Sequence, residues 1–310
     1  MNSPGSPGYS RSRQPIASYL EALALFAAYS LGYAWCAAWC GTHLPARPGS
    51  WLALEAATLG FSVLLVALFD GETFRVPATN RGPGSARGIP NAGSTLFLLG
   101  AVALALRVID PLYDAKEFGL RSIATPAAWL ELLAVLPFGA ATEEMIFRSC
   151  QKRLRELLGS APAIVAIALC FALYHWAPGS PLDRHAIEML IATFIGGLAF
   201  AVAYERTGGL LLLVSIHLAY NFLAVAQTWM HLVHDIVSEA GLFSFWLTLA
   251  GALAWSGRLS RGGFDAPSAE VASPQSRAPA TSRLFAWIFA LGFGCVLPLL
   301  LAWIRIALRF

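Results

Sequence analysis

Long apolar runs, separated by shorter polar stretches, make up most of the chain. A helix needs roughly 20 mostly apolar residues to cross the hydrocarbon core of a bilayer, so about nine of these runs can be transmembrane helices. The runs cover residues 18–39, 51–69, 94–109, 127–148, 162–177, 185–204, 209–230, 242–255 and 284–308. The pattern predicts an all-α fold, a polytopic bundle of about eight to nine transmembrane helices.

Two longer polar stretches, residues 70–93 and 256–283, interrupt this pattern. Both are rich in Pro, Gly, Ser and Arg and lack hydrophobic periodicity, so we expect mobile loops there. Residues 1–16 form a Gly/Pro/Ser tail that we expect to be disordered. The apolar run that follows is too long for a cleaved signal peptide, so it is expected to stay as the first span.

The composition agrees with a membrane protein. Hydrophobic residues make up 57% of the chain and charged residues only 13%, with a mean hydropathy of +0.62. The formal charge of +3 is too small to indicate a nucleic-acid partner, and the five cysteines show no zinc-ribbon or CxxC spacing. With nine spans, most Lys and Arg residues lie on the side of the N-terminus. This bias predicts a multi-pass protein of the cell inner membrane with a cytoplasmic N-terminus.

Ionisable groups inside spans are candidates for function, because their burial is costly unless they are paired or solvated. Three polar clusters stand out: Glu143, Glu144 and Arg148; Phe171 and His175; His217 and Asn221. Residues four apart share a helix face, so Glu144 can pair with Arg148. Glu143 points about 100° away and has no partner in its own segment. We therefore expect Glu143 to act as a general acid or base with a partner from another helix.

The spacing places the three clusters at similar depths. Glu143 lies 16 residues before Gly159 and His175 lies 16 residues after it, so a helical hairpin turning there brings them to one level. A second hairpin, turning at Gly208, places His217 and Asn221 roughly 14 to 20 Å from its turn, on one helix face. The sequence thus predicts a central polar cavity that all three clusters line.

Each cluster also has a simpler interpretation. A lone intramembrane His or Asn often bonds a neighbouring helix, and Glu144 with Arg148 can be a purely structural ion pair. The agreement in depth favours a joint site. The other acids in apolar runs lack partners at a fixed spacing, so packing roles are expected for Glu21, Glu55, Glu131 and Glu188. His231, His234 and Asp235 could hold a metal, but a wet helix end explains them better.

The ordered set Glu-Glu-x-x-x-Arg, Phe-x-x-x-His and His-x-x-x-Asn resembles the CPBP family of intramembrane proteases. This family includes the type II CAAX prenyl endopeptidases and the bacteriocin-processing and self-immunity proteins. The resemblance covers about residues 126–230, expected to be a catalytic helix core between N-terminal helices at 17–125 and C-terminal helices at 231–310. Cys150 departs from the small residue, often glycine, that many members have just after the arginine.

The resemblance implies a glutamic protease. Glu143 would activate water, His175 would assist it, and His217 with Asn221 would stabilise the oxyanion. Glu144 and Arg148 would form a structural pair, while Phe171 is expected to fix the rotamer of its neighbour. The chain contains no HExxH motif, in which two histidines on one helix would bind zinc, and this favours a metal-free site. A divalent metal held by Glu143, His175 and His217 is the alternative.

The predicted activity is cleavage of a peptide bond near the end of a membrane-associated protein, either CAAX-type or the trimming of a C-terminal sorting tail. The expected partners are this protein or peptide substrate and the lipid bilayer, and the sequence does not determine the oligomeric state. The alternative is a non-proteolytic immunity scaffold or a proton-coupled transporter. Against a transporter, the two halves show no inverted repeat and no matching pair of broken spans.

Overall fold

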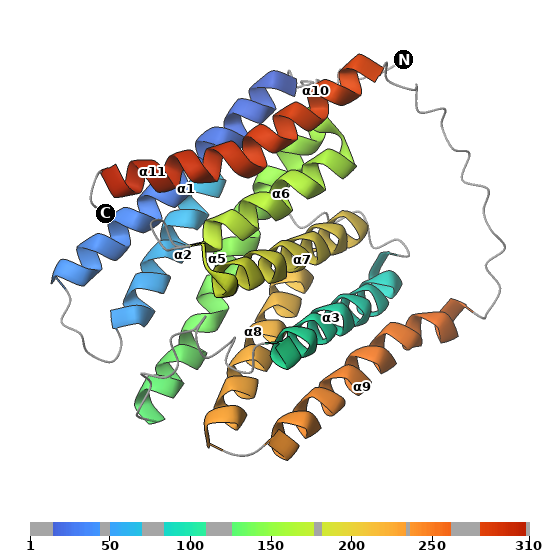
Figure 1. Ribbon diagram of the computed structural model, residues 1–310. Coiled ribbons are helices and arrows are strands. Elements are labelled where there is room, and N and C mark those ends of the chain that lie inside the picture. Colours follow the sequence, from blue (N-terminus) through green and yellow to red (C-terminus); the bar gives the residue numbers. More distant parts are fainter. Residues whose placement is uncertain are drawn as a thin grey trace, which may run out of the picture.

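The computed structural model describes residues 15–43, 50–69, 84–109, 126–176, 182–233, 236–261 and 280–307, and within these ranges helices are the only regular secondary structure. The elements are α1 (Pro15–His43), α2 (Ser50–Phe69), α3 (Gly84–Ile109), α5 (Pro126–Leu158), α6 (Ser160–His175), α7 (Arg184–Thr207), α8 (Leu210–Val233), α9 (Ile236–Arg261), α10 (Ala280–Leu291), the π-helical turn η2 (Gly292–Val296) and α11 (Leu297–Ala307). Each predicted apolar run corresponds to one helical rod, with α10, η2 and α11 forming the last (Figure 1). The predicted all-α fold class is confirmed.

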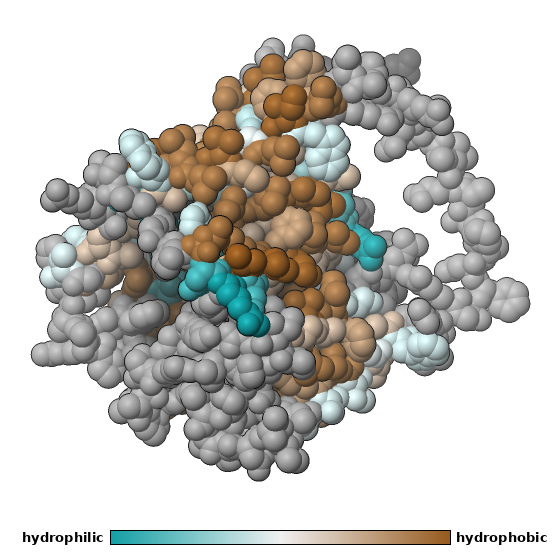
Figure 2. All heavy atoms as spheres, in the orientation of Figure 1, coloured by the Kyte–Doolittle hydropathy of each residue, from teal (hydrophilic) through white to brown (hydrophobic). Residues whose placement is uncertain are grey.

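The helices are apolar enough for a bilayer. Within the described residues, four segments reach the length and hydropathy of a membrane span: Pro15–Cys40, Leu52–Phe69, Ala186–Thr207 and Leu284–Arg305. Shorter apolar helices lie at Ala92–Ala105, Ser160–His175, Leu210–Ala226 and Gly241–Trp255. Apolar side chains cover much of the face in Figure 2. Large apolar surfaces of this kind fit lipid rather than water, and the chain is an integral membrane protein.

Helix α5 lies at the centre of the packing and contacts α1, α2, α6 and α8. Its buried residues Ile146, Phe147 and Leu154 belong to the largest apolar core, together with Phe26 of α1 and Phe293 of η2. A second unit forms where α3 packs along α9 and against α7 (Figure 1). The site described below is therefore built on a helix that is fixed from several sides.

Arg153 ties three helices together near the end of α5. Its guanidinium donates to the Glu21 carboxylate at 3.2 Å and to the carbonyl of Phe69, the last residue of α2, at 2.8 Å. The sequence analysis gave Glu21 a packing role and made no separate prediction for Arg153. In the structure Arg153 is buried, since its charge has a carboxylate and backbone carbonyls as partners.

The two predicted hairpins turn at glycines. Gly159 (φ 79°) lies between α5 and α6, and Gly208 (φ 62°) ends α7 with its N–H donating to Tyr204 O at 2.7 Å. Both lie in the left-handed region, where a residue with a Cβ is disfavoured. Asp183 caps the start of α7 by accepting from the Ala186 N–H at 2.9 Å. These local signals set the lengths of the helices that carry the site.

The structure corrects three predicted boundaries. Residues 84–93 and 256–261, expected to lie in loops, are helical, because α3 begins at Gly84 and α9 continues to Arg261; residues 70–83 and 262–279 lie outside the described residues. Helix α5 continues beyond Arg148 to Leu158 as a polar extension held by the contacts of Arg153. The last span contains a π-helical turn instead of one regular helix.

Glycine content near the start of α3 led to the loop prediction, but one of these glycines serves helix packing. A Cβ on Gly93 would lie 2.3 Å from the backbone nitrogen of Ala254 on α9. Only a residue without a side chain allows the two backbones to approach so closely, as in other membrane helix pairs.

Gly93→Ala is expected to lower the free energy of unfolding by about 1–3 kcal/mol, because the added methyl group meets backbone that cannot move aside. The measurement is equilibrium unfolding in mixed detergent micelles. Gly60→Ala is the control, since a Cβ on Gly60 meets nothing within 4 Å. Equal stability of the two variants would show that the α3–α9 contact is not as close as described.

Candidate active site

The structure brings all three polar clusters to one cavity. Helix α5 supplies the Glu-Glu-x-x-x-Arg cluster, α6 the Phe-x-x-x-His cluster and α8 the His-x-x-x-Asn cluster. A cavity of about 250 Å³ between α5, α6, α7 and α8 is lined by Glu143, His175, His217 and Asn221, among others. We call it the α7–α8 cavity.

Glu143 lies between the two imidazoles. Its carboxylate oxygens are 3.6 Å from His175 Nε2 and 3.8 Å from His217 Nε2. These separations are longer than a direct hydrogen bond and suit a water-sized group that contacts the carboxylate and an imidazole together. The Glu143 side chain is 20% exposed, so it can be reached from the cavity.

Glu144, in contrast, is completely buried and bridges two helices. It accepts a hydrogen bond from Arg148 Nε at 2.9 Å and another from His217 Nδ1 at 2.8 Å. The contact with Arg148 follows the predicted four-residue spacing, whereas the contact with His217, 73 residues further along the chain, was not predicted. A carboxylate only accepts, so the Nδ1 of His217 carries a proton and its Nε2 faces Glu143.

The buried guanidinium of Arg148 continues this network. It donates to the Gln151 side chain at 2.5 Å, and the Gln151 amide donates to the Ala201 carbonyl of α7 at 3.0 Å. Arg148 and Glu144 are both fully buried, and each provides the counter-charge that the other needs inside the protein. Through this chain of contacts, α5 holds both α7 and α8.

Aromatic residues orient both imidazoles. The Phe171 ring lies 4.4 Å from the His175 ring, and the Phe171 carbonyl accepts from His175 Nδ1 at 2.7 Å. The Nε2 of His175 therefore faces Glu143. The Phe200 ring stacks on His217 with centroids 4.6 Å apart. Phe200 was not predicted, because an apolar residue in an apolar helix gives no signal in the sequence.

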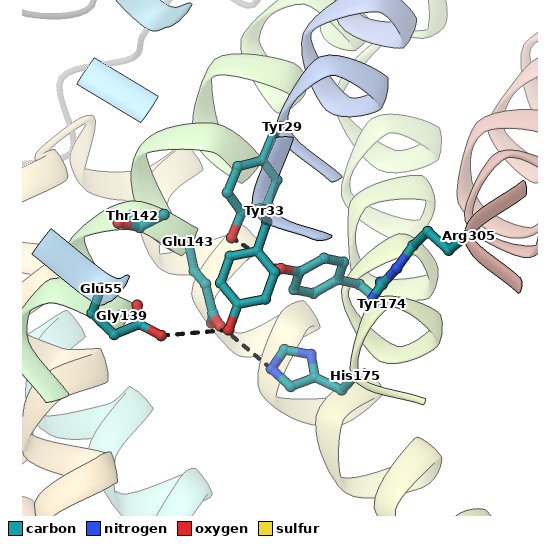
Figure 3. A pocket seen from close by; sticks show the side chains of 9 residues that line it. All are labelled: Tyr29, Tyr33, Glu55, Gly139, Thr142, Glu143, Tyr174, His175 and Arg305. Atoms are coloured by element: carbon teal, nitrogen blue, oxygen red, sulfur yellow. Dashed lines mark hydrogen bonds and ion pairs between the residues drawn. The ribbon is translucent and has the colours of Figure 1, made fainter. Parts of the chain in front are cut away.

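A second cavity, also about 250 Å³, shares Glu143 and His175 in its wall (Figure 3). We call it the tyrosine cavity. It is lined by Tyr29, Tyr33, Glu55, Gly139, Thr142, Glu143, Tyr174, His175 and Arg305. The sequence analysis assigned a packing role to Glu55 and did not consider the others apart from the two site residues. Four of the lining residues lie on α1, α2 and α11, which are distant from α5 and α6 in the sequence, so no spacing could have related them to the site.

Within the described residues, no group of three or more His, Cys, Asp or Glu side chains has an arrangement that could hold a metal ion. The metal-free site stays a prediction. The His231, His234 and Asp235 cluster lies outside the residues whose side chains are described.

Comparison with known families identifies this part of the chain. Residues 125–223 match the model of a family described as type II CAAX prenyl endopeptidase Rce1-like. This region is Rce1-like. It contains α5, α6 and α7 and the part of α8 that bears His217 and Asn221, and so holds all seven predicted site residues. No curated protein and no solved structure matches the chain. The Rce1-like family is a protease family, which confirms the resemblance stated from the three motifs and supports a CAAX-type intramembrane protease in general.

Arg148→Met is expected to lower the free energy of unfolding by about 3–5 kcal/mol, because it leaves the buried Glu144 carboxylate without its counter-charge. Equilibrium unfolding in mixed micelles measures this. The matched control is Arg184→Met, which removes an arginine from the same four-residue pairing with Glu188 but at a side chain that is 73% exposed. The control should change stability by less than about 0.5 kcal/mol. Similar losses in the two variants would contradict a special role for the buried pair.

Proposed function

We propose that this protein is an intramembrane endopeptidase that cuts a peptide bond near the C-terminal end of a membrane-associated protein. The observation that carries the proposal is the position of Glu143, a reachable carboxylate between two imidazoles inside an apolar helix bundle. Acidic side chains that water or substrate can reach are rare inside transmembrane helix bundles unless they have a function. The Rce1-like match of the same helices supports the same reaction.

Glu143 is proposed to act as the general base. A water beside its carboxylate and His175 Nε2 gives its proton to Glu143 and adds to the carbon of the scissile carbonyl. The proton then passes from Glu143 to the nitrogen of the departing amine, the C–N bond breaks, and the carboxylate is restored. His175 Nδ1–H stays bonded to the Phe171 carbonyl, so the ring keeps its Nε2 toward the water throughout.

His217 and Asn221 are proposed to stabilise the oxyanion. The Asn221 amide donates without adding charge. His217 has its Nδ1–H bonded to Glu144, so it can donate from Nε2 only as an imidazolium. The Glu144 carboxylate, 2.8 Å from Nδ1, holds the ring so that Nε2 faces the cavity. This contact gives Glu144 a positioning role for His217 in addition to its pairing with Arg148.

In a metal-dependent reaction, the same side chains would bind a divalent ion instead of acting directly on water and the oxyanion. Glu143, His175 and His217 are the alternative donor set for a divalent ion, but within the described residues no three such side chains have an arrangement that could hold one. We favour the metal-free reaction, since the three groups already provide a base and a cationic donor. Inhibition by a chelator that is reversed by one metal would overturn this part of the proposal.

Glu143→Gln is expected to lower kcat by about 10²–10⁴-fold, because the amide cannot take a proton from water. The assay uses a prenylated peptide ending in a CAAX sequence and a peptide with a C-terminal tail helix, each in liposomes with purified protein. Glu205→Gln, the same change at the end of α7, is the control and should leave cleavage unchanged. Equal cleavage by wild type and Glu143→Gln would remove Glu143 as the base.

Asn221→Ala is expected to lower kcat by about 10²–10³-fold with little change in KM, because an oxyanion donor acts mainly in the transition state. Ser215→Ala on the same helix is the control, since that hydroxyl bonds the Leu211 carbonyl of its own helix. If Asn221→Ala raised KM and left kcat unchanged, Asn221 would bind substrate without serving the oxyanion.

A further inference from the structure

The tyrosine cavity and the α7–α8 cavity both include Glu143 and His175 in their walls. A peptide held for hydrolysis must continue on both sides of the bond that is cut. If the proposed function is right, each cavity therefore receives one side of the substrate.

The two cavities differ in chemistry. Apart from the site residues, the α7–α8 cavity has mainly apolar or small side chains, such as Phe171, Phe200 and Gly196. The tyrosine cavity has the hydroxyl groups of three tyrosines and Thr142, an acid and a guanidinium (Figure 3). Its polar groups are organised: Tyr33 donates to Glu55 at 3.4 Å, and the Tyr174 hydroxyl donates to Tyr29 at 3.1 Å. This side fits a polar segment of the substrate.

Arg305 is the cation of the tyrosine cavity. Within the described residues, no side chain or backbone oxygen forms a hydrogen bond or ion pair with its guanidinium. Arg305 is partly buried at the end of the apolar segment Leu284–Arg305, and its planar fork matches a carboxylate in a bidentate way. Arg305 also lies outside residues 125–223, so its place in the cavity is a feature of this chain beyond the matched region.

The packing of the last helical rod explains why Arg305 faces the cavity. The π-helical turn η2 precedes α11, and one extra residue in a helix rotates everything after it by about 100°. Gly294 of η2 packs so closely on α6 that a Cβ there would lie 2.8 Å from the Ala166 carbonyl. The side of α11 that faces Tyr174 and His175 is thus fixed by contact with α6.

We propose that Arg305 binds the free C-terminal carboxylate of the substrate, so that the tyrosine cavity holds the short peptide that is released. The cut creates a new amine next to Glu143, on the side where Glu55 also lies. The released peptide then has its positive end near the two acids and its negative end at Arg305. This arrangement selects a bond at a short, fixed distance from the end of the substrate chain.

The test compares two farnesylated peptides of one sequence, ending in Cys-Val-Ile-Ser, with either a free carboxylate or a carboxamide at the C-terminus. Wild type is expected to cut the acid about 10- to 100-fold faster in kcat/KM than the amide, and Arg305→Gln should reduce that ratio to about one by slowing only the acid. Arg184→Gln, an exposed arginine at the start of α7, is the control and should keep the wild-type ratio. Equal rates on both peptides in wild type, with cleavage still dependent on Glu143, would overturn the proposal.

A binding measurement separates this proposal from the proposed function. Titration calorimetry measures the tripeptide Val-Ile-Ser, as acid and as amide, binding to Glu143→Gln protein in nanodiscs. The acid should bind at least about tenfold tighter than the amide, and Arg305→Gln in this background should remove the difference. A result in which neither peptide is cut, but the acid still binds through Arg305, refutes the protease and supports the carboxylate site. The proposal is wrong if the acid and the amide bind alike and Arg305→Gln changes only the binding of phosphatidylglycerol in the nanodisc. Arg305 would then contact lipid phosphate.

Discussion

The Glu144 carboxylate is the contact on which the site depends. It is fully buried and joins the Arg148 guanidinium on its own helix to the His217 imidazole on α8. A charge inside an apolar bundle is stable only with partners whose geometry satisfies it. That requirement fixes the distance between α5 and α8 and determines which nitrogen of His217 faces the cavity. With this contact in place, the adjacent Glu143 is left facing both imidazoles.

The two adjacent acids thus have opposite environments for a geometric reason. Consecutive residues on a helix point about 100° apart, so one faces the protein interior and the other a cavity. Glu144 has all its partners within the protein, and Glu143 is the acid that a water or substrate can reach. The same division recurs near the end of α5, where Arg153 is buried against Glu21 and the Phe69 carbonyl. Charges on α5 therefore position the surrounding helices as well as the site.

The parts of the site come from different regions of the chain. The groups proposed for hydrolysis lie on α5, α6 and α8, within the Rce1-like residues 125–223. The tyrosine cavity adds side chains from α1, α2 and α11, outside the matched region. Bond hydrolysis requires a few groups at fixed distances, whereas recognition depends on the wall that surrounds the substrate. Helices outside the matched region can therefore adapt the substrate preference without altering the groups that act on the bond.

Hydrophobic runs and spacing alone predicted the all-α bundle, the two hairpin turns at Gly159 and Gly208, and the common depth of Glu143, His175 and His217. These features follow from local rules: the length that crosses a bilayer, the left-handed glycine at a turn, and the four-residue repeat of a helix face. Only the tertiary structure decided that α3 begins within an expected loop, that Glu144 holds His217, that Phe200 stacks on it, and that Arg305 faces the second cavity. Each of these depends on contact between helices far apart in the sequence, where packing and the pairing of buried charges select one arrangement among many that the local pattern allows.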